Sequence, residues 1–530
     1  MKNFMLAEFG PGIRPGQTGL GSGLHVRIRR AGSARPVLDS GLMADSSTRR
    51  SMLDADICGR ALASRDPRFD GVFFVGIRTT MIYCRPVCPA RVSYPERRRF
   101  FESAAAAERD GFRPCLRCRP ELAPGRALVD AVPRVAQAAA GRIAAGALNG
   151  RGVSQLAHEL GVSDRHLRRA LEREIGVSPA ELAQTHRLLL AKQLLADTSL
   201  PVTRIAFASG FQSLRRFNTV FRERYRMSPS ALRQRRRTPT RAEVPAGATG
   251  DFVRLTLGYR EPMAWGTLIA TLAANATPGV ELVDRSRYCR TVELNGCRGA
   301  IFVEDASGHV TVDVSASLLP VLMPLLARIR HLLDLNAEPA VIDAHLANGG
   351  LASQVALRPG LRMPGAFDGI EVAIRELLRR PGQSNRLAER LTEVLGQPME
   401  TGIPTLNRLA PTAERVADAG AGFLTTLGIP EGRSEAIVAV AGAVADGRLH
   451  LEPGADVQTT LRALNQISGM GERSATAIVS HALHWPDAFD ANDLSLQRSA
   501  GVTGSRALLR MAERWRPWRA YAAAHLWINS

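Results

Sequence analysis

Two short stretches decide the fold near the front of this chain: Cys84-Arg85-Pro86-Val87-Cys88 and Cys115-Leu116-Arg117-Cys118. A C-x3-C pair and a C-x2-C pair, separated by enough residues for a helix, have the spacing of a tetrahedral zinc site with four sulfur ligands. Four thiolates leave no open position on the metal for water, which excludes hydrolytic zinc chemistry. The site is therefore either a folding clip or a nucleophilic thiolate centre.

Arginine is concentrated around these cysteines, at positions Arg85, Arg91, Arg97, Arg98, Arg99, Arg113, Arg117 and Arg119. The chain carries a formal net charge of +19, and lysine occurs only at positions 2 and 192. Guanidinium groups bind phosphate through a fork of N–H donors, so the charge predicts a polyanionic partner. Transfer of a methyl group to one sulfur would remove a negative charge and so strengthen DNA binding.

The chain's 530 residues exceed the size of a single core and predict roughly three to five domains. Its seven cysteines are too few for a secreted disulfide framework, which favours a reducing, cytoplasmic compartment. The sequence contains no apolar run long enough to span a bilayer, so we expect no membrane association. Residues 1–52 lack the apolar core of a signal peptide, and we expect a disordered leader there.

Hydrophobic patterning divides the rest of the chain. We expect strands at Gly71–Gly76 and Thr80–Tyr83 and a helix at Ser103–Arg109 within a cysteine domain. The turn signals Asn295-Gly296 and Ser307-Gly308 separate β-branched runs in a later α+β segment. The predicted domains are the cysteine domain at 53–121, a helical region at 122–237, a linker at 238–250, the α+β segment at 251–330 and a helical domain at 331–530.

The first helical region contains an internal repeat of about 50 residues. Leu156-Ala157, with Gly161 at the following turn, recurs as Ile205-Ala206 with Gly210. Each copy has the helix, turn, helix order of a DNA-binding helix-turn-helix. The second helices would begin near Ser163 and Gln212. They would expose the candidate DNA-binding residues Arg165, Arg168, Arg215 and Arg216. The alternative is an inert helical pair, against which the two basic copies argue.

The stretch Arg78–Arg91, followed by Gly111–Pro120, closely resembles the metal-binding domain of the Ada family of adaptive-response proteins. The resemblance implies that Cys84, Cys88, Cys115 and Cys118 hold Zn²⁺. It also implies that Cys84 accepts a methyl group from a DNA methylphosphotriester, and that Thr80, Arg91 and Arg113 contact DNA. The repeat is similar to the AraC-type double helix-turn-helix, which follows the zinc domain directly in Ada proteins.

The Ada family normally continues into a methyltransferase with a Pro-Cys-His-Arg motif. This chain has no such motif, and beyond Cys118 it contains only Cys289 and Cys297. A different domain therefore takes that place.

The stretch Leu464–Ala475 has the form of a helix-hairpin-helix turn, in which Gly469 and Gly471 let backbone N–H groups approach a phosphate. Asp493 follows at the distance at which helix-hairpin-helix glycosylases place their essential carboxylate. From the residues alone, Asp493 is equally well explained as the N-cap of a helix beginning at Leu494.

The stretches Glu513–Trp527 and Leu357–Gly365 closely resemble the 3-methyladenine DNA glycosylase II (AlkA) family. This resemblance covers about residues 250–530 and implies a TBP-like α+β domain before a helix-hairpin-helix glycosylase domain. It implies that Asp493 is catalytic and that Trp527 stacks on the flipped base. Trp515, Trp518 and Tyr521 fall at helical spacing and are expected in the core.

Two departures from the AlkA pattern bear on the substrate pocket and the DNA wedge. Arg473 and Ala477 stand where the family has aromatic residues, and Ile374–Pro381 replaces the segment that carries the family's apolar wedge.

We therefore predict an α+β multidomain protein. It would combine a small zinc-cysteine domain, an all-α double helix-turn-helix, a TBP-like domain and an all-α glycosylase domain. The expected function is an alkylation-damage response that joins methylphosphotriester sensing and transcription control to excision of alkylated purines. Residues 250–530 contain no lysine, which argues against a Schiff-base lyase and for a monofunctional glycosylase.

The expected cofactor is Zn²⁺. The expected partners are alkylated double-stranded DNA and operator or promoter DNA, with RNA polymerase as a further candidate. Two alternatives remain open at this point. One is a regulator whose glycosylase domain is inactive and only binds damage, and the other is a zinc-dependent DNA-binding protein without transfer chemistry.

Overall fold

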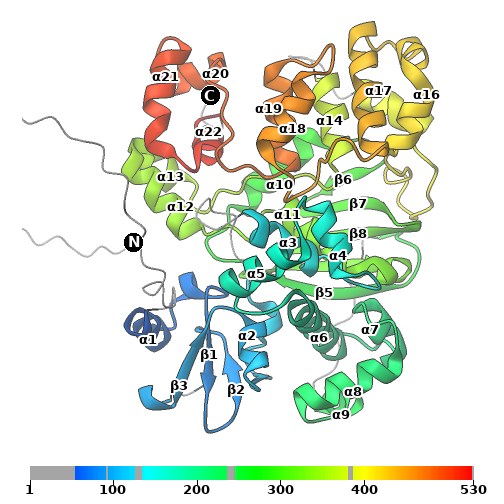
Figure 1. Ribbon diagram of the computed structural model, residues 1–530. Helices are drawn as coiled ribbons and strands as arrows, with labels where there is room; N and C mark the ends of the chain where they lie inside the picture. Colours follow the sequence, from blue (N-terminus) through cyan, green and yellow to red (C-terminus); the bar gives the residue numbers. More distant parts are fainter. Residues whose placement is uncertain are drawn as a thin grey trace, which may run out of the picture. The chain divides into compact units, whose positions relative to one another are not determined.

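The computed structural model describes residues 54–90, 93–125, 134–235, 244, 246–379 and 386–527 (Figure 1). The leader predicted for residues 1–52 lies outside these ranges, as do the candidate DNA contact Arg91 and most of the predicted linker. The last residues of the replaced wedge segment, Arg380 and Pro381, also lie outside them. The described chain is a mixture of helices and two small sheets, which confirms the predicted α+β multidomain class.

The cysteine domain is built on a four-stranded sheet of order β3-β1-β2-β4. The strands are β1 (Phe74–Ile77), β2 (Ile82–Cys84), β3 (Arg98–Phe101) and β4 (Arg113–Pro114), and the helices are α1 (Ala55–Ser64) and α2 (Ala104–Arg109). The 3-10 turns are η1 (Pro67–Phe69), η2 (Pro95–Arg97) and η3 (Pro120–Leu122). Strands β1 and β2 and helix α2 match the sequence prediction. Strands β3 and β4 were not predicted, because arginines occupy half of these short segments.

The next region is helical, as predicted. It consists of α3 (Arg134–Ala144), α4 (Val153–Glu159), α5 (Asp164–Glu174), α6 (Pro179–Asp197), α7 (Val202–Ala208), α8 (Leu214–Tyr225) and α9 (Pro229–Gln234). Helices α4–α5 and α7–α8 form the two helix-turn-helix units, and α6 connects them. The turn glycines Gly161 (φ +66°) and Gly210 (φ +86°) have the left-handed backbone that favours glycine. Helix α8 begins after the N-cap Ser213 rather than near Gln212, because Ser213 Oγ accepts the N–H of Arg216.

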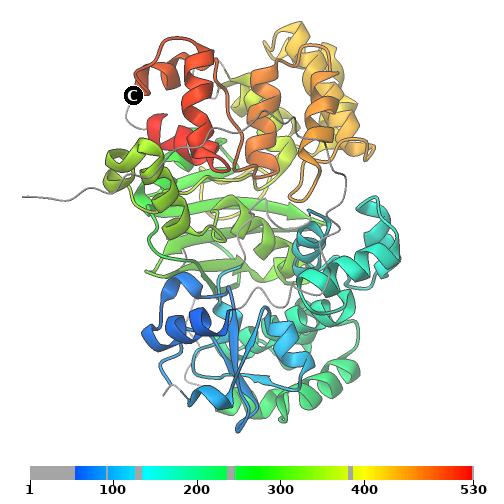
Figure 2. The ribbon, with the colours of Figure 1, turned by 60° about the vertical axis from the view of Figure 1, so that its left-hand side comes forward.

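The α+β segment forms an antiparallel sheet of order β5-β9-β8-β7-β6, drawn in green in Figure 2. Its strands are β5 (Phe252–Gly258), β6 (Glu281–Asp284), β7 (Arg287–Leu294), β8 (Cys297–Asp305) and β9 (His309–Ser315). Its helices are α10 (Trp265–Asn275), the 3-10 helix η4 (Ala316–Val321) and α11 (Leu322–Leu332). Both predicted hairpin turns are present, with positive φ at Asn295, Gly296, Ser307 and Gly308.

The remaining chain is helical. Its elements are α12 (Pro339–Leu346), η5 (Ala347–Leu351), α13 (Ala352–Leu357), α14 (Gly369–Leu378), α15 (Arg386–Leu395), α16 (Ala413–Thr426), α17 (Glu431–Ala445), α18 (Val457–Asn465), α19 (Glu472–Ala482), α20 (Leu494–Ser499), α21 (Ser505–Ala512), η6 (Glu513–Trp515) and α22 (Arg519–Trp527). Helix α14 packs against α17 and α19 around one core, and α12, α13, α21 and α22 contribute to a second. None of the described helices is long and apolar enough to cross a bilayer.

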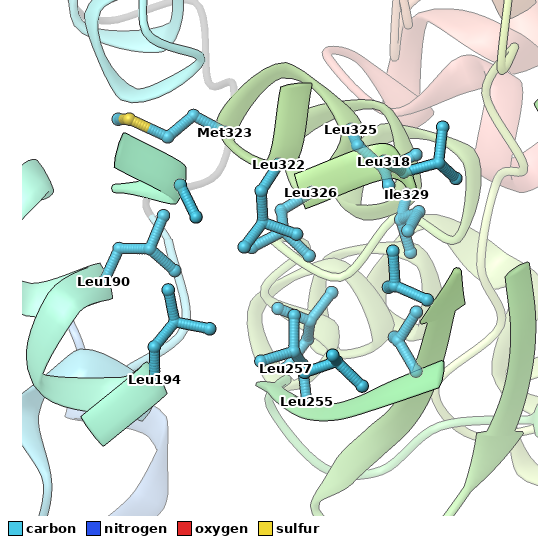
Figure 3. Packing of buried hydrophobic residues seen from close by; sticks show 14 of the residues in the cluster. Leu190, Leu194, Leu255, Leu257, Leu318, Leu322, Met323, Leu325, Leu326 and Ile329 are labelled. Atoms are coloured by element: carbon cyan, nitrogen blue, oxygen red, sulfur yellow. The ribbon is translucent and has the colours of Figure 1, made fainter. Parts of the chain in front are cut away.

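One hydrophobic cluster joins the helix-turn-helix region to the five-stranded sheet. Leu190 and Leu194 of α6 point toward Leu255 and Leu257 of β5 and toward α11 (Figure 3). A hydrogen bond from Gln193 Nε2 to the carbonyl oxygen of Thr256 (2.7 Å) fixes the same contact. The two halves of the chain therefore share a core, and a fragment beginning near residue 250 would expose Leu255 and Leu257.

We predict that Leu194→Ala lowers the free energy of unfolding by about 2–5 kcal/mol, because Leu194 is fully buried in this shared core. Chemical denaturation followed by circular dichroism measures the change. Leu357→Ala is the control: this leucine is 69% exposed, and its replacement should change stability by less than about 0.5 kcal/mol. Equal stabilities of the two variants would contradict the shared core.

Candidate functional site

The four cysteines of the predicted zinc site come together in space. Cys84 ends β2, Cys88 lies in the loop that follows, and Cys115 and Cys118 follow β4. Their sulfur atoms all lie within 4.8 Å of one another. Tetrahedral Zn–S bonds of about 2.3 Å place sulfurs roughly 3.8 Å apart, so this donor set fits zinc. Bound zinc would keep these side chains in the thiolate form.

The sulfur atoms differ in their hydrogen bonds rather than in their burial. Cys118 Sγ accepts the N–H of Arg85 (3.4 Å), Cys115 Sγ accepts that of Arg117 (3.4 Å), and Cys88 accepts a backbone N–H from Ala90. Within the described part of the chain, no backbone N–H is directed at Cys84 Sγ. A hydrogen bond stabilises a thiolate and reduces its reactivity, so Cys84 carries the least stabilised sulfur of the four.

Several arginines around the cysteines have partners within the protein. Arg85 pairs with Asp70 and donates to the carbonyl oxygen of Cys118 (3.2 Å). Arg99 pairs with Asp110 (2.6 Å). Arg98 and Arg119 are likewise engaged, with Ser93 in the first case and with Glu121 and Asp197 in the second. These four arginines therefore have intramolecular partners, and their contact with phosphate stays a prediction.

Two predicted DNA contacts lie at one end of the small sheet. Thr80 is exposed in the turn between β1 and β2. Arg113 begins β4, is paired with Ile82, and donates its N–H to the carbonyl oxygen of Met81 (2.8 Å). The parallel pairing of β2 with β4 thus brings Thr80 and Arg113 together, although they are far apart in the sequence.

The two predicted recognition helices are amphipathic, as expected. Arg165 and Arg168 of α5 are exposed, and so are Arg215 and Arg216 of α8. The opposite faces of the same helices are buried in the cores, through Leu167, Leu171, Phe217 and Phe221. Both helices therefore have one apolar face in a core and one basic face in solvent.

An ion pair between Lys192 and Glu121 was not predicted from the sequence. Both side chains are almost completely buried, and Lys192 Nζ also lies 3.5 Å from the carbonyl oxygen of Cys115. The pair connects helix α6 to the loop that carries two of the cysteines. The only sequence signal was that Lys192 is one of two lysines in a chain that otherwise uses arginine.

A second buried carboxyl group joins the same two domains. Glu108 of α2 accepts hydrogen bonds from Tyr83 (3.1 Å) and from Thr185 of α6 (2.9 Å), and Arg224 of α8 lies 3.8 Å away. Burial raises the pKa of Glu108 to about 7, against the opposing charge of Arg224.

The predicted helix-hairpin-helix turn is present between α18 and α19. Gly469 has φ +81°, and a Cβ atom there would lie 2.4 Å from the carbonyl oxygen of Gly432, so only glycine fits. Gly471 is the N-cap of α19, and a Cβ atom there would meet nothing within 4 Å. The start of α19 is therefore open on this side, as an approaching phosphate requires.

Asp493 is the N-cap of α20, which confirms the capping interpretation of this residue; its catalytic role stays a prediction. Its Oδ1 accepts the N–H groups of Ser495 (2.8 Å) and Leu496 (3.1 Å) and the hydroxyl of Ser495. Burial acts to raise the pKa of Asp493, but these hydrogen bonds and the charge of Arg473 outweigh it, and the pKa is lowered. Asp493 is therefore ionised at neutral pH.

Arg473 contacts the other oxygen of the same carboxylate. Its Nη2 lies 2.8 Å from Asp493 Oδ2, and its Nε lies 3.7 Å from Asp490. The Arg473 side chain is 74% exposed, while that of Asp493 is 6% exposed. The sequence identified Arg473 as a departure from the AlkA pattern, but its contact with Asp493 was not predicted.

The aromatic residues near the C-terminus differ in burial, as expected. Trp515 and Tyr521 are buried, and the Tyr521 hydroxyl donates to Asp334 (2.7 Å), while Trp518 packs against His345. Trp527, the candidate base-stacking residue, is 44% exposed at the end of α22. Arg519 holds this helix to the preceding loop through a two-point contact with Asp487 (2.7 and 2.8 Å).

A pocket of about 50 Å³ between α10, α14 and α19 is separate from Asp493. Buried Arg290 crosses it, pairing with Glu371 (2.8 Å) and lying 3.7 Å over the ring of Phe367. These contacts tie the five-stranded sheet to the helical domain, and we assign the pocket to the joint between them.

Comparison with known families matches three parts of the chain. Residues 57–121 match the metal-binding domain of Ada, residues 156–235 a helix-turn-helix domain, and residues 254–368 the AlkA N-terminal domain. The chain is 32% identical to DNA-3-methyladenine glycosylase 2 of Escherichia coli over 280 residues, which is 52% of this chain and 96% of that protein. It is 47% identical to the bifunctional transcriptional activator/DNA repair enzyme Ada of Escherichia coli over 64 residues, covering 12% of this chain and 18% of that one.

A relative from Mycobacterium tuberculosis, the probable bifunctional transcriptional activator/DNA repair enzyme AlkA, spans nearly the whole chain. The two are 37% identical over 484 residues, which is 90% of this chain and 96% of the relative. The order of zinc-cysteine domain, helix-turn-helix pair and AlkA-type domain is thus found within one related protein. The chain belongs to the family of bifunctional transcriptional activator/DNA repair enzymes that join an Ada-type front half to an AlkA-type back half.

Proposed function

We propose that this protein responds to DNA alkylation in two ways: it records methylation of the DNA backbone on Cys84, and it excises alkylated bases at Asp493. One chain contains both a four-cysteine cluster that fits zinc and a buried, ionised carboxylate beside a helix-hairpin-helix turn. This combination is the observation that carries the proposal. The family relationship supports both halves.

In the first activity, the Cys84 thiolate attacks the methyl carbon of a methylphosphotriester. A C–S bond forms, the bond from that carbon to the phosphate oxygen breaks, and its electron pair stays on the oxygen as a phosphodiester anion. Cys84 becomes a neutral thioether, so the reaction happens once per protein. The missing hydrogen bond to Cys84 Sγ, compared with those on Cys115 and Cys118, supports the choice of this cysteine.

Loss of one negative charge at the cysteine cluster reduces repulsion from the DNA backbone. We propose that the exposed arginines of α5 and α8 then bind operator or promoter DNA in successive major grooves. Thr80, Arg91 and Arg113 would contact the methylated strand. RNA polymerase is the proposed further partner in transcription control, in a cytoplasmic protein associated with the nucleoid. The proposal also includes the domain bounds predicted from the sequence: 53–121, 122–237, 238–250, 251–330 and 331–530.

We predict that Cys84→Ser accepts no methyl group from methylphosphotriester DNA and holds zinc more weakly, because serine is a poor zinc ligand. Mass spectrometry of the digested protein and a zinc assay measure both effects. Cys297→Ser is the control, since Cys297 lies outside the cluster and its loss should change neither result. A methyl group found on Cys88, Cys115 or Cys118 of the wild-type protein would refute the choice of Cys84.

In the second activity, an alkylated base is flipped out of the duplex toward Asp493. The bond between base and sugar breaks, and its electron pair leaves with the base. The Asp493 carboxylate stabilises the positive charge that develops on the sugar and positions the attacking water. Gly469 and Gly471 would hold the DNA backbone, and Trp527 would stack on the flipped base.

We further propose that the excision is that of a monofunctional glycosylase acting on 3-methyladenine-type purines. A strand-cleaving lyase needs an amine to form a Schiff base, and residues 250–530 contain no lysine. The rival proposal is a domain that binds damage without excising it, which the contact of Arg473 with Asp493 Oδ2 favours. Base release by the full-length chain separates the two, because the shared core makes an isolated fragment unsuitable.

We predict that Asp493→Asn lowers the rate of 3-methyladenine release from alkylated DNA by roughly 100-fold or more. Asparagine caps a helix as well as aspartate does, so the variant removes the charge and keeps the start of α20. Asp490→Asn is the matched control, because it removes a neighbouring carboxylate and should leave the rate within about threefold of wild type. Undiminished release by Asp493→Asn, with DNA binding intact, would remove the catalytic assignment.

A further inference from the structure

The two oxygens of the Asp493 carboxylate have different partners. Oδ1 is held by Ser495 and Leu496 at the start of α20. Among the described residues, Oδ2 receives a hydrogen bond only from Arg473. The proposed reaction needs a carboxylate oxygen that faces the sugar, and the capping contacts leave only Oδ2 for this role. Any base or sugar that approaches Asp493 therefore meets the guanidinium of Arg473 as well.

The Arg473 side chain can yield to a substrate without leaving the site. Arg473 is the second residue of α19, after the N-cap Gly471 and Glu472, and its side chain is 74% exposed. An ion pair with one exposed partner is weak, because water competes for the exposed group. Asp493, by contrast, is fixed by three hydrogen bonds. Substrate binding thus moves the arginine and not the carboxylate, and the displaced donors remain beside the bound base.

Ala477 lies on the same side of α19 as Arg473. It lies one turn after Arg473, is partly buried, and has a side chain of a single methyl group. An electron-poor, cationic base is best held by aromatic faces. Here the helix instead offers a cation and a small side chain, so this side of α19 suits hydrogen-bond acceptors better than positive charge.

We infer that Arg473 sets the relative rates at which the site releases two classes of base: it favours neutral purines with acceptor atoms and slows the release of cationic purines, the class to which 3-methyladenine-type substrates belong. This inference rests on the proposed glycosylase function. The planar guanidinium can donate two N–H groups to neighbouring acceptors on a purine edge, such as N7 and O6. A purine alkylated at N7 has lost one of these acceptors and gained a charge that the guanidinium repels.

The same contact assists the departure of a neutral base. When the bond to the sugar breaks, the electron pair moves onto the base, and a neutral base leaves as an anion. Donation from Arg473 stabilises that negative charge as it develops. A cationic purine becomes neutral as it leaves and needs no such donor. Arg473 thus aids one class of substrate and disfavours the other.

The test compares two duplexes of identical sequence, one with a single hypoxanthine and one with a single 7-methylguanine, under single-turnover conditions with the full-length protein. For Arg473→Ala we expect release of 7-methylguanine to rise and release of hypoxanthine to fall. The ratio of the two rates should shift by roughly tenfold or more toward 7-methylguanine. Arg473→Lys keeps the positive charge but lacks the paired N–H donors of the guanidinium. We therefore expect this variant to release hypoxanthine more slowly and not to release 7-methylguanine faster.

Arg498→Ala is the matched control. Arg498 is an exposed arginine of α20 that donates to the carbonyl oxygen of Leu494 and does not contact Asp493, so its loss should leave the ratio unchanged. An unchanged ratio in Arg473→Ala, or an equal fall in both rates, would overturn the inference and leave Arg473 as a general DNA contact. A wild-type protein that releases 3-methyladenine but neither of these two bases would overturn the inference alone, whereas one that releases none of the three would contradict the proposed glycosylase function.

Discussion

Helix α6 is the element on which the rest of the described structure depends, because consecutive residues of it contact different domains. Lys192 forms a buried ion pair with Glu121 of the zinc-cysteine domain. Gln193 donates a hydrogen bond to Thr256 of β5 (2.7 Å), and Leu194 packs in the core that β5 shares with α11. One turn of helix thus connects the zinc-cysteine domain, the helix-turn-helix region and the five-stranded sheet.

Because these contacts are buried, removing one partner of a contact costs free energy of folding. Lys192 and Glu121 are both almost fully buried, and removing either would leave the other as an uncompensated charge in the interior. The apolar contacts around Leu194 add a term that depends on both halves being present. The sensing half and the repair half are therefore joined by a common core as well as by the chain between them.

The two candidate reaction centres follow one physical rule. In each, most of the reactive group is held by hydrogen bonds while one atom is left for chemistry. Within the described ranges, backbone N–H groups donate to the sulfurs of Cys115 and Cys118, and none is seen on that of Cys84. Oδ1 of Asp493 is committed to the start of α20, and among the residues that the structure describes its Oδ2 accepts a hydrogen bond only from the exposed Arg473 side chain. Fixing the neighbours positions the reactive atom without reducing its reactivity.

Local patterns in the sequence determined the zinc ligands, the two helix-turn-helix units, the hairpin turns and the capping role of Asp493, because each depends on residues close together in the chain. The short strands β3 and β4 were not predicted from the sequence, because arginines interrupt their hydrophobic pattern and their pairing is non-local. Only the tertiary structure decided that Arg85 and Arg99 pair with the carboxylates of Asp70 and Asp110, that α6 shares a core with β5, and that Arg473 reaches Asp493. The physical reason is that an arginine side chain has the same pattern in a sequence whether it meets a phosphate or a carboxylate, and only the packing of separate elements places its partner.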